Sequence, residues 1–230
     1  AAAGGAPLSD AATGVMTLHG ELGAARTTLK GLVSKQHDTS TAVFELSRNF
    51  TELSNNSLNT VLRSSLVTFG DGAQGLSAIL RQRSDENGEC ELLAVLKTYK
   101  MLAGAINDQL KGRQKLSAAI DKANASLADH QSQASKLSGK AGKEKKVADL
   151  EQKCDAIKEQ VSAMRDEHAL FTRTLQWELE RFHRAKNAEL RSSLTDLAIR
   201  NRDHAQREYA AWSELGTTLS GLDEPQAERK

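Results

Sequence analysis

The sequence predicts an all-α fold of three long helices that pair as an antiparallel coiled coil. No proline occurs between Leu8 and Asp223, where average usage would place roughly ten. A proline inside a helix costs about 3 kcal/mol, so such a stretch is typical of very long helices. Apolar residues also recur at alternating spacings of three and four, and only 4% of residues are aromatic. This pattern favours a coiled-coil core of Leu, Ala, Ile and Val.

The first predicted helix spans about residues 8–54. Its apolar seam keeps a heptad register, with a polar interval at Gln36 and Thr39. The apolar members are Val15, Leu18, Leu22, Ala25, Leu29, Leu32, Val43, Leu46, Phe50 and Leu53. A tight turn is predicted at residues 54–57, because Asn and Ser side chains compete for backbone hydrogen bonds. Residues 1–7 are expected to be a linker or a remnant outside the folded domain.

The second predicted helix spans about residues 57–137. Gly70-Asp71-Gly72 interrupts its apolar seam, and composition alone allows either a turn or a weakened, unbroken helix there. The polar patch from Ser84 to Glu89 is expected to shift the phase of the seam, which resumes at Leu92. Two glycines within residues 138–143 predict the next loop.

The third predicted helix spans about residues 143–221 and is followed by a C-terminal tail at residues 222–230. The phase of its seam slips between residues 175 and 190. Such slips indicate that the buried face changes partner, which favours dimerisation over part of the chain. The candidate dimer core consists of Phe50, Leu62, Leu66, Phe69, Leu194 and Trp212.

Charge and spacing exclude several function classes. The net charge of +1 argues against nonspecific binding of nucleic acid. No apolar stretch approaches the length of about 18 residues that a transmembrane helix needs. The histidines show no metal-ligand spacing, and no phosphate-binding loop or nucleophile motif is present. We therefore expect no enzymatic activity, no metal and no cofactor, and we interpret Cys90 and Cys154 as thiols in a reducing cytoplasm.

Two segments together resemble a known family. They are residues 77–116 and residues 177–215, the latter with Glu180-Arg181-Phe182, Lys186, Glu189-Leu190 and an aromatic end at Tyr209 and Trp212. The second segment is similar to the terminal helix of retromer-associated sorting nexins that carry a BAR domain. The resemblance implies a BAR domain at residues 8–221, a crescent-shaped dimer of three-helix protomers, and an unbroken helix through Gly70-Asp71-Gly72. In that family a phosphoinositide-binding phox-homology domain normally precedes the BAR domain.

The resemblance also implies a function and partners. We expect a module that senses or generates membrane curvature, peripheral on endosomal membranes, which supports tubule-based protein sorting. Its expected partners are a second copy or another sorting nexin, an anionic phosphoinositide membrane, and retromer, but no nucleic acid. The alternative from the residues alone is a cytosolic coiled-coil or spectrin-like scaffold that does not contact lipid.

The basic residues expected at the membrane depart from the family pattern. The stretch Leu127–Gln131, where the family carries a Lys/Arg cluster, is not basic here, and positive charge lies farther out along the chain. Lys111 and Lys115 share a helix face because they are four residues apart. The candidate membrane-binding residues are Lys111, Lys115, Lys140, Lys143, Lys145 and Lys146.

Overall fold

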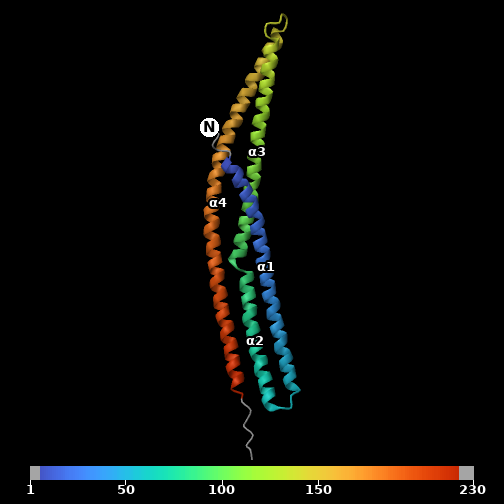
Figure 1. The fold of residues 1–230 in the computed structure, drawn as a ribbon, viewed down its shortest axis with the longest axis vertical. Coiled ribbons are helices and arrows are strands. Elements are labelled where there is room, and N and C mark those ends of the chain that lie inside the picture. The colour runs from blue at the N-terminus through green and yellow to red at the C-terminus, as the bar shows by residue number, and fades with distance from the viewer. Residues whose placement is uncertain (1–5, 223–230) are drawn as a thin grey trace, which may run out of the picture. The chain divides into compact units, whose positions relative to one another are not determined.

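The computed structural model describes residues 6–222, with side chains from residue 13 onward. It contains four helices: α1 (Ala6–Asn55), α2 (Thr60–Gly88), α3 (Glu91–Leu137) and α4 (Glu144–Ser220) (Figure 1). No strand occurs among residues 6–222, and no helix there carries an apolar stretch long enough to cross a bilayer. The all-α fold class with three long helical segments is confirmed, and α2 and α3 together form the second segment.

The second segment is interrupted where the sequence predicted only a phase shift. Glu89 and Cys90 separate α2 from α3, and the Cys90 N–H donates to the Asn87 carbonyl rather than continuing the helical ladder. The Ser84 hydroxyl and the Asn87 amide bond to other helices, and Gly88 is a poor helix former. The polar patch therefore ends one helix and precedes the next.

The loop predicted at residues 138–143 lies where the sequence placed it, and the turn predicted at residues 54–57 lies two residues later, because Ser54 and Asn55 belong to α1. Residues 56–59 connect α1 to α2, and the Asn59 side chain caps α2 by accepting a hydrogen bond of 2.9 Å from the Leu62 N–H. Residues 138–143 connect α3 to α4, and Gly139 and Gly142 have φ angles of 78° and 75°. Glycine adopts this left-handed conformation without a Cβ clash.

Helix α1 begins at Ala6, inside the predicted linker. Apart from residues 6, 7 and 222, the predicted linker and C-terminal tail lie outside the described residues.

The chain divides into two compact units. Unit 1 is Ala1–Gly20 with Lys100–Lys186, and unit 2 is Glu21–Tyr99 with Asn187–Lys230. In unit 1, α3 and α4 run antiparallel from the loop at residues 138–143 (Figure 1). The described core of unit 1 comprises Val15, Ala103, Leu110, Leu150, Cys154, Val161, Leu175, Leu179 and Phe182.

In unit 2, α2 forms hydrogen bonds with both α1 and α4. The Ser84 hydroxyl donates to the Val33 carbonyl of α1, and Arg83 donates to Glu208 of α4 at 2.8 Å. The described core of this unit comprises Leu22, Leu66, Ala73, Leu76, Cys90, Leu92, Val95, Leu96, Tyr99 and Leu215. Helix α2 is therefore the central element of unit 2.

The glycines inside α2 serve close helix packing. The helix is unbroken through Gly70-Asp71-Gly72, as the resemblance implied. A Cβ at Gly70 would lie 2.6 Å from the Thr51 hydroxyl and 3.2 Å from the Ser47 carbonyl oxygen of α1. A Cβ at Gly72 would lie 2.6 Å from a methyl of Leu215 in α4. A side chain at Gly72 would therefore require the Leu215 side chain to move, and one at Gly70 would also press on the α1 backbone.

Two substitutions in α2 test this packing. Gly75→Ala adds a methyl into open space and should raise the free energy of unfolding by about 0.5–1 kcal/mol through helix propensity. Gly70→Ala gains the same propensity but meets α1, and should lower the free energy of unfolding by about 1–2 kcal/mol net. Urea unfolding followed by circular dichroism measures both, and equal effects of the two variants would contradict the close approach at Gly70.

Candidate functional site

Large apolar side chains are exposed mainly on unit 2. Soluble monomers rarely leave such side chains uncovered over a continuous area, and larger exposed patches mark interaction sites. The exposed members in unit 2 are Leu32, Phe44, Leu46, Leu53, Leu58, Leu62, Val67, Leu194, Ile199, Tyr209 and Trp212. Helices α1, α2 and α4 and the loop at residues 56–59 contribute to this set, which we call the unit 2 apolar surface.

The part of this surface on α1 has a heptad pattern. Leu32, Leu46 and Leu53 stand at intervals of seven or fourteen residues, and between 39% (Leu46) and 54% (Leu53) of each side chain is exposed. The sequence interpretation placed these three leucines on the packed seam. The residues that follow Leu46 and Leu53, Ser47 and Ser54, are buried instead. The leucines therefore form a second stripe that faces away from the protomer's own core.

Three serines contribute to the packed seam of α1 in unit 2, beside Leu22 and Phe50. Ser40, Ser47 and Ser54 recur every seven residues and are buried. The hydroxyls of Ser40 and Ser54 donate to carbonyls of their own helix, at 2.7 and 2.6 Å. Both buried hydroxyls therefore have a hydrogen-bond partner, and their burial carries no penalty for an unsatisfied polar group. Serine has a short side chain, which allows the close approach of α1 to Gly70. The recurring serines were therefore the sequence signal that α1 is rotated so that Leu32, Leu46 and Leu53 face outward.

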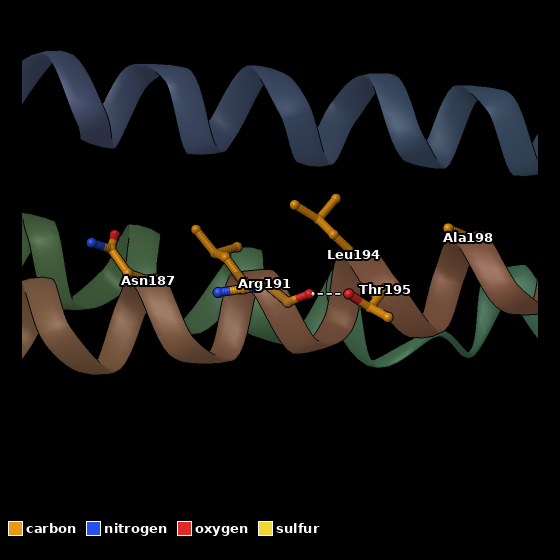
Figure 2. A pocket seen from close by; sticks show the side chains of 6 residues that line it. Asn187, Arg191, Leu194, Thr195 and Ala198 are labelled. Carbon is orange, nitrogen blue, oxygen red and sulfur yellow. Dashed lines mark hydrogen bonds between the residues drawn. The ribbon is translucent and has the colours of Figure 1, made fainter.

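The part of the surface on α4 is a shallow groove. Its lining consists of Asn187, Leu190, Arg191, Leu194, Thr195 and Ala198. Figure 2 shows the Leu194 side chain extending from α4 on the side where the α1 ribbon runs. The Thr195 hydroxyl donates to the Arg191 carbonyl at 2.9 Å (Figure 2), so this hydroxyl is satisfied within the helix. The groove thus presents mainly apolar atoms to solvent.

The six predicted dimer residues fall into two groups. Leu62, Leu194 and Trp212 are about half exposed and belong to the unit 2 apolar surface. Leu66 is buried in the protomer, and the rings of Phe50 and Phe69 pack against each other with centroids 4.6 Å apart. The structure thus brings Phe50 and Phe69 together within one chain and leaves the first three free for a partner.

The predicted membrane residues are all exposed. Lys140, Lys143, Lys145 and Lys146 lie in and just after the loop at residues 138–143. The Glu144 carboxylate accepts a hydrogen bond from the Gly142 N–H at 3.2 Å, and it is the only acid among residues 136–146. This segment, which we call the tip, therefore carries an excess of positive charge around a backbone turn built on two glycines.

The basic residues of α3 differ in orientation. Lys111 and Lys115 are exposed, and Lys111 pairs with Asp108 at 3.5 Å. Arg113 is partly buried, and its Nε donates to the Thr172 hydroxyl of α4 at 2.9 Å. Lys115 is thus available to an external anion and Lys111 shares its charge with Asp108, whereas Arg113 helps to hold α3 against α4.

A polar cluster lies at the C-terminal end of α2. His204 is fully buried, and its Nε2 is 2.9 Å from a Glu86 carboxylate oxygen. Arg83 donates to Asn201 and Glu208, and Asn87 donates to Gln36 of α1. Sequence reasoning missed this cluster, because its members are scattered polar residues on three helices.

Ionisation in the cluster follows from these contacts. Burial raises the pKa of Glu86, but hydrogen bonds with Gln82 and His204 and the charges of His204 and Arg207 outweigh it. The pKa of Glu86 is therefore lowered. Its contribution to the free energy of unfolding is full above the ordinary pKa of a glutamate and is lost as the pH falls from there through the lowered pKa.

Another titratable group lies in the core of unit 2. Burial and the adjacent carboxylate of Glu189 raise the pKa of Tyr99 from 10.0 to about 12. Both effects disfavour the charged phenolate. The neutral phenol of α3 is thus held against α4.

Comparison with known proteins agrees with this architecture. A family model described as Vps5 C terminal like matches residues 8–217. No curated protein matches the chain. Among solved structures, the chain is similar to the EFC/F-BAR domain of Drosophila Syndapin/PACSIN, with 12% identity, 94% of this chain and 86% of that chain covered, and a TM-score of 0.53.

Two further structures are similar in fold. The N-terminal I-BAR domain of D. discoideum IBARa has 10% identity, coverage of 95% of this chain and 93% of that chain, and a TM-score of 0.50. The Imp2 F-BAR domain has 16% identity, coverage of 90% and 79%, and a TM-score of 0.50. At these identities the likeness concerns the fold alone.

The pKa of Tyr99 has a consequence for stability at high pH. Because the folded state disfavours the phenolate, the contribution of Tyr99 to the free energy of unfolding is full below pH 10.0 and is lost as the pH rises toward about 12. Wild type should therefore lose stability more steeply over this range than Tyr99→Phe. Urea titrations at several pH values measure the difference, and parallel curves for the two proteins would contradict it.

Proposed function

The chain belongs to the Vps5 C-terminal-like family, and on this premise we propose that it is a BAR-type dimerisation module that senses membrane curvature. The unit 2 apolar surface is the observation that carries the proposal. Each half-exposed leucine that a partner buries contributes on the order of 1 kcal/mol, and the exposed side chains come from three helices. A second protomer of the same kind, or another sorting nexin, would cover them.

The tip and α3 lysines supply the membrane contact in this proposal. Lys140, Lys143, Lys145 and Lys146 are exposed, and each basic residue near an anionic bilayer contributes about 1 kcal/mol, which salt screens. Binding by one protomer is therefore weak and reversible. A dimer that joins two tips converts weak contacts into avidity, which is greatest where the membrane shape lets both tips reach lipid.

The cellular role that we propose is more specific than membership of the family alone implies. We place the chain among sorting nexins that act peripherally on endosomal tubules, with retromer as a partner. The segment at residues 177–215 supports this role through Arg181-Phe182 and Lys186, where Phe182 is buried and the Lys186 ammonium lies 6.0 Å from its ring centroid. Localisation of the tagged chain to endosomal tubules, and its capture with retromer subunits, would test the role.

Substitution of an exposed groove residue tests dimerisation. Leu194→Glu places a charge on the unit 2 apolar surface without touching the protomer core, and should weaken the dimer by about a hundredfold or more because the charge would be buried unpaired. Leu66→Glu is less informative, since Leu66 is buried within one chain and its replacement disturbs the protomer itself. Sedimentation equilibrium at micromolar concentration measures the mass.

Met101→Glu is the matched control for Leu194→Glu. Met101 is 65% exposed and lies in unit 1, so this variant should remain dimeric and keep the wild-type helicity. A wild-type monomer at micromolar concentration, or an unchanged mass for Leu194→Glu, would count against the proposed interface.

Charge reversal of the six lysines tests the membrane surface. Glutamate at Lys111, Lys115, Lys140, Lys143, Lys145 and Lys146 should weaken co-sedimentation with phosphatidylserine and phosphoinositide vesicles and leave helicity and dimer mass unchanged. Raising salt from about 0.1 M to 0.5 M should weaken wild-type binding, because the Debye length falls below about 10 Å. Vesicles of phosphatidylcholine alone are the control. Undiminished binding by the sixfold variant would refute this surface.

A further inference from the structure

One face of α4 in unit 1 carries an exposed tryptophan. The buried residues Leu175, Leu179 and Phe182 fix which side of α4 packs inward. Trp177 lies midway between Leu175 and Leu179 in sequence, so at about 100° per residue it points to the opposite side. It is 55% exposed, and Leu170, seven residues earlier on the same face, is 61% exposed. The outer face of α4 therefore presents two large apolar side chains to solvent.

Arginines surround these two side chains. Arg173 and Arg181 stand four residues before and after Trp177, and Arg184 stands seven after it, so all three share its face. The Arg181 guanidinium carbon lies 5.6 Å from the centroid of the Trp177 ring. Acidic neighbours offset part of the charge, since Glu178 pairs with Arg181 at 3.9 Å and Glu180 is also exposed. Arg173, Arg181, Arg184 and Lys186 still outnumber the two acids among residues 170–186.

We propose that Leu170 and Trp177, together with Arg173, Arg181 and Arg184, form an interfacial anchor that inserts shallowly into an anionic bilayer. This inference rests on the proposed membrane function of the chain. Tryptophan is favoured at the boundary between headgroups and acyl chains, where its ring is buried and its N–H stays hydrated. Guanidinium groups bind lipid phosphates with two parallel hydrogen bonds, which a lysine ammonium cannot form. The outer face of α4 therefore matches an anionic bilayer in two ways. Its arginines suit the lipid phosphates, and its tryptophan suits the boundary between headgroups and acyl chains.

This anchor differs in kind from the tip. The tip lysines act as point charges and are screened by salt, whereas an inserted tryptophan and leucine contribute through apolar burial, which salt does not weaken. Membrane binding should accordingly have two components. The part that survives at high salt should depend on Leu170 and Trp177.

Tryptophan fluorescence with brominated lipids tests the anchor. The chain contains two tryptophans, and the second, Trp212, belongs to the unit 2 apolar surface. Vesicles of phosphatidylserine with phosphatidylcholine brominated near the headgroup should quench wild-type emission and shift it to shorter wavelength. Trp177→Phe should lose most of that quenching, because only Trp212 remains.

Binding measurements accompany the fluorescence. Trp177→Ser with Leu170→Ser should weaken vesicle binding at 0.5 M salt by at least about fivefold, while Met101→Ser, an equally exposed control in unit 1, should not change it. Binding of wild type without quenching of Trp177, or equal quenching in Trp177→Phe, would overturn the anchor and leave the proposed function standing. Failure of wild type to bind any anionic vesicle would overturn both. A shift of Trp177 emission by poly-glutamate, with none by vesicles, would assign the face to an acidic protein and overturn the anchor.

Discussion

The close approach of α1 to α2 is the constraint on which the rest of unit 2 depends. A Cβ at Gly70 would meet the Thr51 hydroxyl and the Ser47 carbonyl oxygen of α1, so the two helices approach each other at a position of α2 that has no side chain. This contact fixes the rotation of α1 about its own axis. With Ser47 and Ser54 buried, Leu46 and Leu53, one position earlier, face outward. The exposed leucine stripe is therefore a geometric result of the glycine contact.

Polar pairing adds a second constraint on α2. Arg83 bonds to Glu208, and Glu86 contacts a fully buried His204, so α2 and α4 are joined by charged and ionisable groups. Removing one partner from such a pair leaves the other unpaired, which costs more than the pair contributes. A slip of α4 by one turn would break both contacts at once. The cluster thus sets the register of α4, while the glycines set how closely the helices approach.

The sequence predicted the helices and loops well because their signals are local. Prolines, the paired glycines of residues 138–143 and the Asn/Ser run near residue 55 act on the backbone of their own segment. The rotation of α1 depends on another helix, and apolar spacing placed Leu46 and Leu53 inward because it counts leucine as core and ignores serine. The break at Glu89–Cys90 has the same origin, since Ser84 and Asn87 bond to other helices. Among the basic residues, the tip lysines were predictable from their glycine loop, whereas the inward turn of Arg113 depends on Thr172.

The outward leucines of α1 also bear on the fate of a newly made chain. In the proposed dimer a partner covers Leu32, Leu46 and Leu53, and in an unassembled chain these side chains are accessible to chaperones and proteases. A partner that binds the folded chain but not the unfolded chain stabilises the folded state by mass action. The cellular half-life of the chain should therefore follow the supply of its partner, and surplus copies should be cleared as orphan subunits.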